Sequence, residues 1–308
     1  MSSRQGAGIA LSLAILGWSF SPIFIRYLQN AYDPFMQAGI RYLGAVIFLV
    51  PYCLMFYRNG FKTALSKPLP ILILSIVNVL MQATWTIGIY YSTASLGQIL
   101  QKIEIPIVAI FSFLVFSEER FLIKQPRFII GTLLGIFGSV LLVYRPSAAN
   151  EFPNLYLAVL SLVISAFFWG IYSVYGKYTV ERGLHPIPMF GMVSIYTTIG
   201  LFILGFLFGN PAKVLQADWT VHAIAIFSGL LPIAVAHSAF HYAQLHLGAA
   251  FCNTLLTLDP LITHFFAILL WKNEQLNTIQ WLGTSILLIG CISVLFTQSS
   301  IKGETLPE

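Results

Sequence analysis

Four ionisable side chains lie deep within long hydrophobic segments of the sequence: Arg41, Lys102, Glu104 and Asp259. A charge near the centre of a bilayer costs about 2.5–3.5 kcal/mol, so each of these side chains should face a cavity, a partner or water. In membrane proteins such residues mark pathways for substrates, ions or protons. The four residues therefore predict a polar site inside a membrane.

Glu104 and Asp259 occupy similar places in two of these segments. Glu104 lies two residues before Pro106, and Asp259 lies directly before Pro260. Each carboxylate is about 15 Å into its segment at 1.5 Å per residue, which places both near the midplane. Each proline removes a backbone hydrogen bond and leaves a polar carbonyl there, as expected of a transporter site. The structural alternative is that Glu104 pairs with Lys102 or Arg41 and Asp259 with a hydroxyl, closing a helix contact.

Helical spacing assigns different roles to the four charges. Lys102 and Glu104 are two residues apart, so they should point to different faces and not satisfy each other, which favours a functional role. Asp259 shares a face with Thr263 rather than with the polar stripes described next. Arg41 lies early in its segment and should extend its side chain to the outer interface, which favours a structural role.

Polar and aromatic residues recur at helical spacing in three further places. The sets are Asn78, Gln82 and Trp85; His237, His241 and Gln244; and Asn253, Thr257 and His264, with Gln98 and Gln101 adding amide groups beside Lys102. In a bilayer such a stripe must face a cavity or a neighbouring helix. Hydrogen bonds between helices are the alternative use of these residues. Because the first two sets fall on segments that an internal repeat makes equivalent, we favour a shared cavity.

The composition identifies lipid as the surroundings. Of the 308 residues, 57% are hydrophobic and 9% are charged, and the mean hydropathy is +0.82, which leaves too few charges to cover a water-soluble globule. The net charge of +5 comes from Lys and Arg in short connectors, a pattern of membrane topology rather than of nucleic-acid binding. Cys53, Cys252 and Cys291 form no spaced set, so we expect neither disulfides nor a metal or other cofactor.

Ten hydrophobic segments are long enough to span a bilayer, at about 20 residues each. They are residues 6–28, 34–57, 68–91, 94–117, 126–144, 154–178, 186–208, 219–245, 248–271 and 278–298. No cleavage site follows the first segment, so we expect it to remain as a helix. Ten connector Lys and Arg residues fall on the side of the N-terminus and four on the other, which predicts that both termini are cytoplasmic.

The two halves of the sequence repeat each other at an offset of 151 to 154 residues. The matched landmarks include Trp18 with Trp169, Arg26 with Lys177, Pro106 with Pro260, and Gly131 and Gly138 with Gly283 and Gly290. Each half holds an odd number of spans, so the second half must insert upside down relative to the first. The predicted fold is an all-α integral membrane protein of ten transmembrane helices, as two inverted five-helix repeats. The first repeat is residues 1–150, and the second, with a short C-terminal tail, is residues 151–308.

These motifs resemble those of the drug/metabolite transporter superfamily, specifically its ten-helix EamA-type members. The resemblance rests on Gly17-Trp18-Ser19, Arg26-Tyr27, Arg41-Tyr42-Leu43, the run from Ala94 through Pro106 to Ser117-Glu118-Glu119-Arg120, and the run from Gly248 through Asp259-Pro260 to Asn273-Glu274-Gln275, followed by Gly283 and Gly290. It covers essentially the whole chain and specifies the fold more strongly than the substrate. The Lys102-Ile103-Glu104 cluster is not typical of the family and points to a distinctive substrate.

The resemblance implies a central cavity between the inverted halves, walled mainly by the first, third, fourth, sixth, eighth and ninth helices. In that cavity we expect Lys102 to bind an anionic group and Glu104 a cationic one. The apolar surface is expected from Trp18, Trp85, Trp169, Tyr172 and Tyr242. A zwitterion with an apolar body fits this set, so the leading hypothesis is a secondary transporter of an amino acid or S-adenosylmethionine.

Coupling and location follow from the same resemblance. Glu104, Asp259 or His264 is the candidate carrier of a coupling proton, because carboxylates and histidines inside membranes serve proton relays. The implied partners are a small-molecule substrate and the lipid bilayer, and the implied location is a bacterial inner membrane. Another metabolite class, such as a nucleoside, a nucleotide sugar or a drug-like compound, is the alternative substrate.

A membrane-embedded metallohydrolase is the competing class of function. His237 and His241 are four residues apart and could share a metal with Asp259 and His264. The sequence has no His-Glu-x-x-His motif and no catalytic acid beside the two histidines, so we favour the transporter. A channel fits poorly, because no ring of like charge accompanies the inverted repeats.

Overall fold

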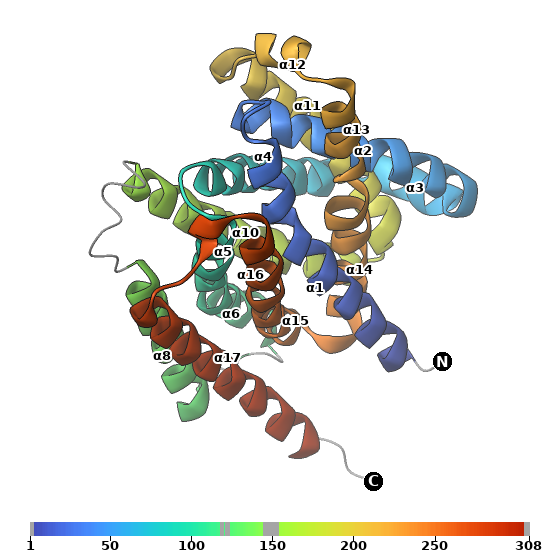
Figure 1. Ribbon diagram of the computed structural model, residues 1–308. Helices are drawn as coiled ribbons and strands as arrows, with labels where there is room; N and C mark the ends of the chain where they lie inside the picture. Colours follow the sequence, from blue (N-terminus) through green and yellow to red (C-terminus); the bar gives the residue numbers. More distant parts are fainter. Residues whose placement is uncertain (1–2, 118–119, 121–123, 144–153, 305–308) are drawn as a thin grey trace.

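The hydrophobic segments form helices whose ends lie close to the predicted bounds (Figure 1). This computed structural model describes residues 3–117, 120, 124–143 and 154–304. Seven of the predicted spans are single helices: α1 (Ser3–Leu28), α2 (Pro34–Phe56), α4 (Pro68–Tyr90), α8 (Pro126–Val143), α10 (Leu155–Glu181), α11 (Pro186–Phe208) and α17 (Thr278–Glu304). Proline begins α2, α4 and α11, a position where its missing N–H costs no hydrogen bond.

The other three spans are interrupted near their middle. The fourth consists of α5 (Ala94–Leu100), the 3₁₀ turn η1 (Gln101–Ile103) and α6 (Glu104–Val115), and the ninth of α15 (Ala249–Leu255), the 3₁₀ turn η4 (Leu256–Leu258) and α16 (Asp259–Leu270). The eighth contains α13 (Trp219–Phe227), the π-helical segment η3 (Leu230–Val235) and α14 (Ala236–Leu247). The short helices α3 (Arg58–Ser66) and α12 (Ala212–Gln216) and the turn η5 (Lys272–Glu274) lie in connectors.

Lengths and hydropathies within the described residues fit an integral membrane protein. Eight helical spans are long and apolar enough to cross a bilayer, and two shorter apolar helices, Pro126–Gly138 and Thr278–Gly290, occupy the fifth and tenth positions. This agrees with the predicted ten helices. The predicted boundary between residues 150 and 151 falls outside the described part of the chain, so the limits of the two repeats stay a prediction.

The helix pairs follow a pattern that is unchanged when the two halves are exchanged. α2 packs against α11 and α8 packs against α17, so each of these helices contacts its own repeat equivalent. α1, the first span of the first half, packs against α14 in the third span of the second half. In the equivalent contact, α10, the first span of the second half, packs against α4, the third span of the first half. The contacts of α1 with α16 and of α10 with α6 are related in the same way. Two repeats related by a twofold axis produce this pattern.

Glycines that mark the repeat permit the closest of these contacts. A Cβ atom added to Gly138 of α8 would lie 2.6 Å from the carbonyl oxygen of Gly283 on α17. One added to Gly290 of α17 would collide with the carbonyl oxygen of Gly131 on α8. Small residues let two helices approach in a bilayer, where dispersion contacts hold them together. The landmarks found in the sequence therefore form one symmetric interface.

A buried ion pair joins the two halves at one end of the bundle. Arg26 Nε lies 3.0 Å from Glu274 Oε1, and Arg26 Nη1 donates to the carbonyl of Ser92. The Glu274 carboxylate also accepts the N–H groups of Ala94 and Ser95, at 2.9 Å each. These N–H groups begin α5, where a carboxylate is favoured by the helix dipole. The end of α1, the start of α5 and the connector before α17 are thus tied together.

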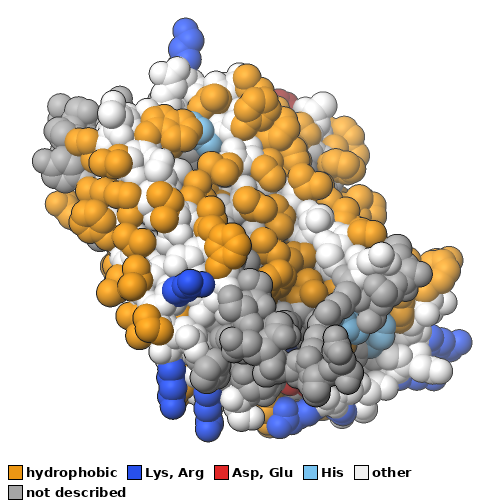
Figure 2. All heavy atoms as spheres, turned by 90° about the horizontal axis from the view of Figure 1, so that it is seen from below, with side chains coloured by type: hydrophobic (Ala, Val, Ile, Leu, Met, Phe, Trp, Pro, Cys, Tyr) orange, Lys and Arg blue, Asp and Glu red, His pale blue; other side chains and the backbone are white. Residues whose placement is uncertain are grey.

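Hydrophobic side chains cover the outside of the bundle. Figure 2 shows them spread over the face seen from below, with most of the visible Lys and Arg side chains towards its edges. Phe206, Phe208 and Leu269 are 68%, 72% and 67% exposed, values that would be costly in water and are ordinary against lipid tails. The surface therefore supports the conclusion, drawn from composition, that the chain is an integral membrane protein.

Gly138→Ala should destabilise the protein, because the new methyl group meets backbone atoms of α17, and overpacking of this kind costs about 1–3 kcal/mol. Gly135→Ala on the same helix is the matched control, since a Cβ atom there meets no atom within 4 Å. The measurement is thermal unfolding of the two variants in detergent. A melting temperature lowered by several degrees in the first variant alone is expected; equal melting temperatures would contradict the interface.

Candidate functional site

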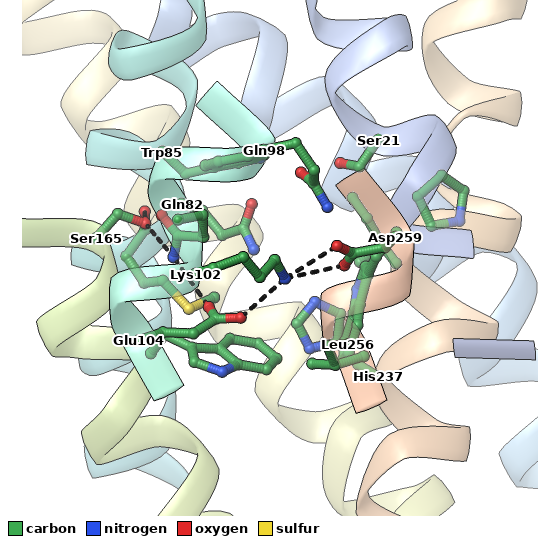
Figure 3. Close-up of a pocket in the computed structure, with 16 residues that line it drawn as sticks. Ser21, Gln82, Trp85, Gln98, Lys102, Glu104, Ser165, His237, Leu256 and Asp259 are labelled. Carbon is green, nitrogen blue, oxygen red and sulfur yellow. Dashed lines mark hydrogen bonds and ion pairs between the residues drawn. The ribbon is translucent and has the colours of Figure 1, made fainter. Parts of the chain in front are cut away.

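A cavity near the middle of the bundle is lined by residues from six spans (Figure 3). Its lining residues are Trp18 and Ser21 of α1; Met81, Gln82 and Trp85 of α4; Gln98, Gln101, Lys102 and Glu104 of the fourth span; Ser165 and Trp169 of α10; Pro232, Ile233 and His237 of the eighth span; and Leu256 and Asp259 of the ninth. It encloses about 520 Å³ of empty space, including the part open to solvent. The six spans are the ones that the resemblance names as cavity walls.

The broken fourth and ninth spans bring two carboxylates to this cavity. Glu104 is the first residue of α6, and Asp259 is the first residue of α16. Each follows a 3₁₀ turn, so the two acids occupy equivalent positions in the two repeats. The N–H of Glu104 is bonded back to the carbonyls of Gln101 and Lys102, and that of Asp259 to the carbonyl of Leu256, so each span continues through its turn as a tightened helix. The same local device therefore positions both acids.

The ammonium group of Lys102 lies between the two carboxylates, as Figure 3 shows. Lys102 Nζ is 3.1 Å from Glu104 Oε1, 3.0 Å from Asp259 Oδ1 and 3.1 Å from Asp259 Oδ2. Gln101 Nε2 donates to the other oxygen of Glu104 at 3.3 Å. All three charged residues are at most 3% exposed. With every group ionised, this triad of Lys102, Glu104 and Asp259 carries one positive and two negative charges.

The prediction that Lys102 and Glu104 point to different faces is wrong. Residues two apart are separated by about 160° around an α-helix at 3.6 residues per turn, but by about 120° in a 3₁₀ turn at 3.0 residues per turn. The turn η1 contains Lys102 and ends where Glu104 begins α6, which brings the two side chains together. Asp259 also lines the cavity, whereas Asn253, Thr257 and His264 of the stripe on its span do not, which agrees with the prediction that Asp259 lies on another face than that stripe.

The prediction that Arg41 extends to the outer interface is also wrong. Its side chain is only 1% exposed. Arg41 Nε donates to Ser228 Oγ at 3.0 Å, and Arg41 Nη2 donates to Ser21 Oγ at 2.9 Å. Arg41 is therefore an interior residue, and its hydrogen bond to Ser21 connects it to the cavity wall.

Aromatic rings form another part of the cavity wall. The rings of Trp18 and Trp169 meet edge to face with centroids 5.0 Å apart, and the ring of His237 lies 5.1 Å from Trp18. Trp169 Nε1 donates to Asn253 Oδ1 at 2.7 Å, which fixes that indole. The predicted Trp18, Trp85 and Trp169 all line the cavity. A rigid aromatic wall beside charged groups suits a ligand with an apolar or cationic part.

Several predicted site residues do not line the cavity, and most of them bond to other helices. Asn78 Nδ2 donates to Tyr42 and to Thr197, and His241 exchanges a hydrogen bond with the Tyr172 hydroxyl at 3.1 Å. The others of this group are Gln244, bonded to Ser173; Asn253, bonded to Ser173 and Trp169; Thr257, which is buried; His264, bonded to Ser95; and Tyr242, whose ring meets His246. Of the three stripes, only Gln82, Trp85 and His237 line the cavity. The hydrogen-bonding alternative therefore describes most of the remaining members.

The cavity also contains residues that sequence reasoning missed: Ser21, Met81, Ser165, Pro232, Ile233 and Leu256. Ser21 lies three residues after Trp18 on the same helix face, a spacing that could have identified it. Ser165 receives a hydrogen bond from Gln101 and donates one to the carbonyl of Met81. The apolar members carry no chemical signal that separates them from lipid-facing or core residues.

Some buried polar atoms of the cavity have no hydrogen-bond partner among the described residues. They are Gln101 Oε1, His237 Nδ1 and Asp259 Oδ1, the last of which forms an ion pair with the Lys102 ammonium. Buried polar groups are nearly always satisfied, so such atoms indicate where a ligand or water binds. The cavity therefore has the properties of a binding site and not only of a packing defect.

The four side chains of the competing metal hypothesis are not assembled into a metal site. His264 contacts Ser95 and Trp281, and His241 contacts Tyr172 and Gln244, away from Asp259. Within the part of the chain that the structure describes, no group of three or more His, Cys, Asp or Glu side chains could hold a metal ion.

An inverted-repeat bundle of this kind, with a polar cavity between its halves, is typical of secondary transporters. The model of the EamA-like transporter family matches residues 6–144 and 156–296. The chain belongs to this family, and with it to the drug/metabolite transporter superfamily, as the sequence motifs indicated. The two matched blocks correspond to the two repeats.

Three curated relatives cover nearly the full chain. An uncharacterized transporter of Haemophilus influenzae is 26% identical over 91% of this chain and 93% of its own length. An uncharacterized transporter of Archaeoglobus fulgidus is also 26% identical, over 84% and 87%. The uncharacterized inner membrane transporter YhbE of Escherichia coli is 24% identical over 95% and 92%. A crystal structure of a protein with 14% identity has a TM-score of 0.71 over 97% of this chain and 99% of the other, which shows the shared fold alone.

Lys102→Met should destabilise the protein, because it leaves two buried carboxylates without their cation. Breaking a buried ion pair costs about 3–5 kcal/mol. Adding Glu104→Gln and Asp259→Asn to the same chain removes the charges and should recover most of the lost stability. Thermal unfolding in detergent measures both effects, with Lys62→Met, on the exposed side of α3, as the control. A single Lys102→Met variant as stable as the control would show that the triad is not held by this lysine.

Proposed function

We propose that this transporter moves a small zwitterionic or amino-acid-like metabolite, such as an amino acid or S-adenosylmethionine, across the membrane by alternating access. The observation that carries the proposal is that two carboxylates in the midplane cavity share one lysine. Midplane sites formed by broken helices are where transporters of this architecture bind their substrates.

The charge of the triad favours a cationic group on the substrate. Lys102 can neutralise one carboxylate, which leaves one negative charge in a site almost closed to water. An ammonium or sulfonium group bound beside Glu104 and Asp259 supplies the missing positive charge. The ammonium group of Lys102 is bonded to both acids, so it does not bind the anionic end of the substrate in this proposal, in contrast to the expectation from the sequence.

The aromatic wall suits the rest of such a molecule. Trp18, Trp85 and Trp169 offer stacking surfaces on the sides of the cavity, and each ring face also attracts a cation. An aromatic amino acid or the adenine ring of S-adenosylmethionine would use these surfaces. A nucleoside would use them too, but it would leave the negative charge of the triad without a partner.

Protons are the proposed coupling ion. When no substrate cation is present, a proton on Glu104 or Asp259 neutralises the second carboxylate. Substrate and proton then compete for the same two acids, which couples their movements in opposite directions. His264, the other predicted proton carrier, lies between Ser95 and Trp281 and is assigned no part in this exchange.

Alternating access requires that the two halves separate on each side in turn. On one side they are joined by the contacts of Arg26 and Glu274 with the start of α5. Along α1, Arg26 lies five residues beyond Ser21, which lines the cavity. We assign these contacts to the closed state of that side.

The proposed location is a bacterial inner membrane with both termini in the cytoplasm, as the distribution of Lys and Arg predicts. The name of the Escherichia coli relative places that protein in the inner membrane. The proposed partners are the bilayer, the substrate and protons, with no cofactor.

Uptake into proteoliposomes tests the function. The panel contains amino acids, S-adenosylmethionine and nucleosides, with and without an imposed pH gradient, and mass spectrometry identifies what accumulates. We expect accumulation of a zwitterionic member that responds to the gradient. Glu104→Gln should reduce this uptake at least about tenfold, because it removes a charge that the substrate requires.

Glu181→Gln is the matched control, since Glu181 lies at the end of α10 in a partly exposed ion pair with Lys177. Uptake in this variant should equal that of the unmodified protein. Selective uptake of nucleosides, or full activity of Glu104→Gln, would contradict the proposed substrate class.

A further inference from the structure

Arg41 is a buried cation without a carboxylate partner. Among the described residues, no acidic side chain lies within ion-pair distance of it, and its side-chain hydrogen bonds go to two hydroxyl groups, those of Ser21 and Ser228. Removing a charge from water costs several kcal/mol unless an opposite charge or several hydrogen bonds compensate. Two neutral hydroxyls are weak compensation for a guanidinium group that can donate five hydrogen bonds.

The two serines bonded to Arg41 differ in whether their own hydroxyl proton has an acceptor. Ser228 Oγ donates to the carbonyl of Ala225 at 2.7 Å while it accepts from Arg41. Ser21 Oγ accepts from Arg41, and no described group accepts the Ser21 proton. By comparison, Ser19 on the same helix donates to the carbonyl of Ile15 at 2.7 Å. A hydroxyl has a single proton, so that of Ser21 is available to an acceptor outside the helix.

Ser21 presents this proton to the cavity. It is one of the lining residues, whereas Arg41 stands behind it. The hydrogen bond from Arg41 occupies one of the two lone pairs of the Ser21 oxygen. The positive charge behind the hydroxyl strengthens it as a donor, since hydrogen bonds assisted by charge are stronger than neutral ones. The wall at Ser21 therefore favours an anionic acceptor.

Asp259 of the triad lies on a helix that neighbours Ser21 in the same cavity. α1 and α16 pack together, and Thr263 Oγ1 donates to the carbonyl of Ser19 at 2.7 Å. Asp259, one turn before Thr263, lines the cavity from α16, while Ser21 lines it from α1 (Figure 3). A donor backed by a positive charge and a site with excess negative charge thus lie on adjacent walls. An α-amino acid carries its carboxylate and ammonium groups on one carbon, so it needs such an arrangement.

We propose that Ser21, with Arg41 behind it, is the subsite that binds the carboxylate of the transported molecule. This rests on the proposed function and deepens it, because it restricts the substrates to those with an α-amino-acid headgroup. Ser21 contacts the carboxylate directly. Arg41 acts through Ser21 as a positioning residue, and the bound anion supplies the negative charge that Arg41 lacks.

Matched ligand pairs that differ only in the carboxylate test this subsite. The pairs are phenylalanine with phenethylamine, and S-adenosylmethionine with its decarboxylated analogue. Binding to the full-length protein in detergent is followed by tryptophan fluorescence, to which Trp18, Trp85 and Trp169 in the cavity wall contribute. The measured quantity is the ratio of the two dissociation constants within a pair, so a general loss of binding does not change it.

We expect the unmodified protein to bind the acid-bearing member of at least one pair more tightly, by about tenfold or more. Ser21→Ala and Arg41→Gln should reduce this ratio towards one. Arg41→Lys should restore part of the ratio, because it returns the positive charge. Ser19→Ala, which alters a buried serine of the same helix that does not line the cavity, should keep the full ratio.

The outcomes separate this inference from the proposed function. If the unmodified protein prefers the acid-bearing member and Ser21→Ala keeps that preference, the carboxylate subsite is wrong and the transporter proposal stands. If the unmodified protein binds the amine as well as the amino acid, the subsite is also wrong. If neither member of either pair binds, the proposed substrate class fails together with the subsite. Ser21→Ala decides the question even if Arg41→Gln does not fold, since it removes one cavity hydroxyl and leaves the helices unchanged.

Discussion

The lysine that two carboxylates share is the interaction on which the arrangement of the cavity depends. Lys102, Glu104 and Asp259 are almost completely buried, so none of them can exchange its partner for bulk water. Charges in such surroundings are stable only in combination with one another. The combination requires that the fourth and ninth spans approach each other at their broken midpoints, which holds the two inverted halves together around the cavity.

The repeat explains why two acids meet there and why there is one cation. Glu104 and Asp259 begin α6 and α16, the equivalent half-helices of the two repeats. In the second 3₁₀ turn the middle residue, the place that Lys102 holds in the first, is Thr257. The duplication thus placed an acid in each half, while only one half supplies a lysine. The excess negative charge that underlies the proposed function arises from this single difference between the repeats.

Much of the fold could be predicted from the sequence, and less of the site. Span positions followed from hydrophobic length, and the repeat followed from landmarks such as Gly138 and Gly290, which the structure places at the α8–α17 interface. Depth in a hydrophobic segment correctly singled out Lys102, Glu104 and Asp259 as interior residues. Their mutual contact was missed because a regular helix was assumed where η1 and η4 occur, and 3₁₀ turns have no strong sequence signal. The depth of Arg41 was misjudged because its hydroxyl partners come from other segments, which spacing along one helix cannot reveal.

Counting protons released on substrate binding tests the central claim most directly. Purified protein in weakly buffered detergent solution is mixed with the member of the amino-acid and S-adenosylmethionine panel that it transports, and a pH indicator reports the protons set free. If substrate and proton compete for the acids of the triad, binding should release about one proton per molecule bound, and Glu104→Gln should abolish the release. Tight binding to the unmodified protein with no proton released would contradict the account.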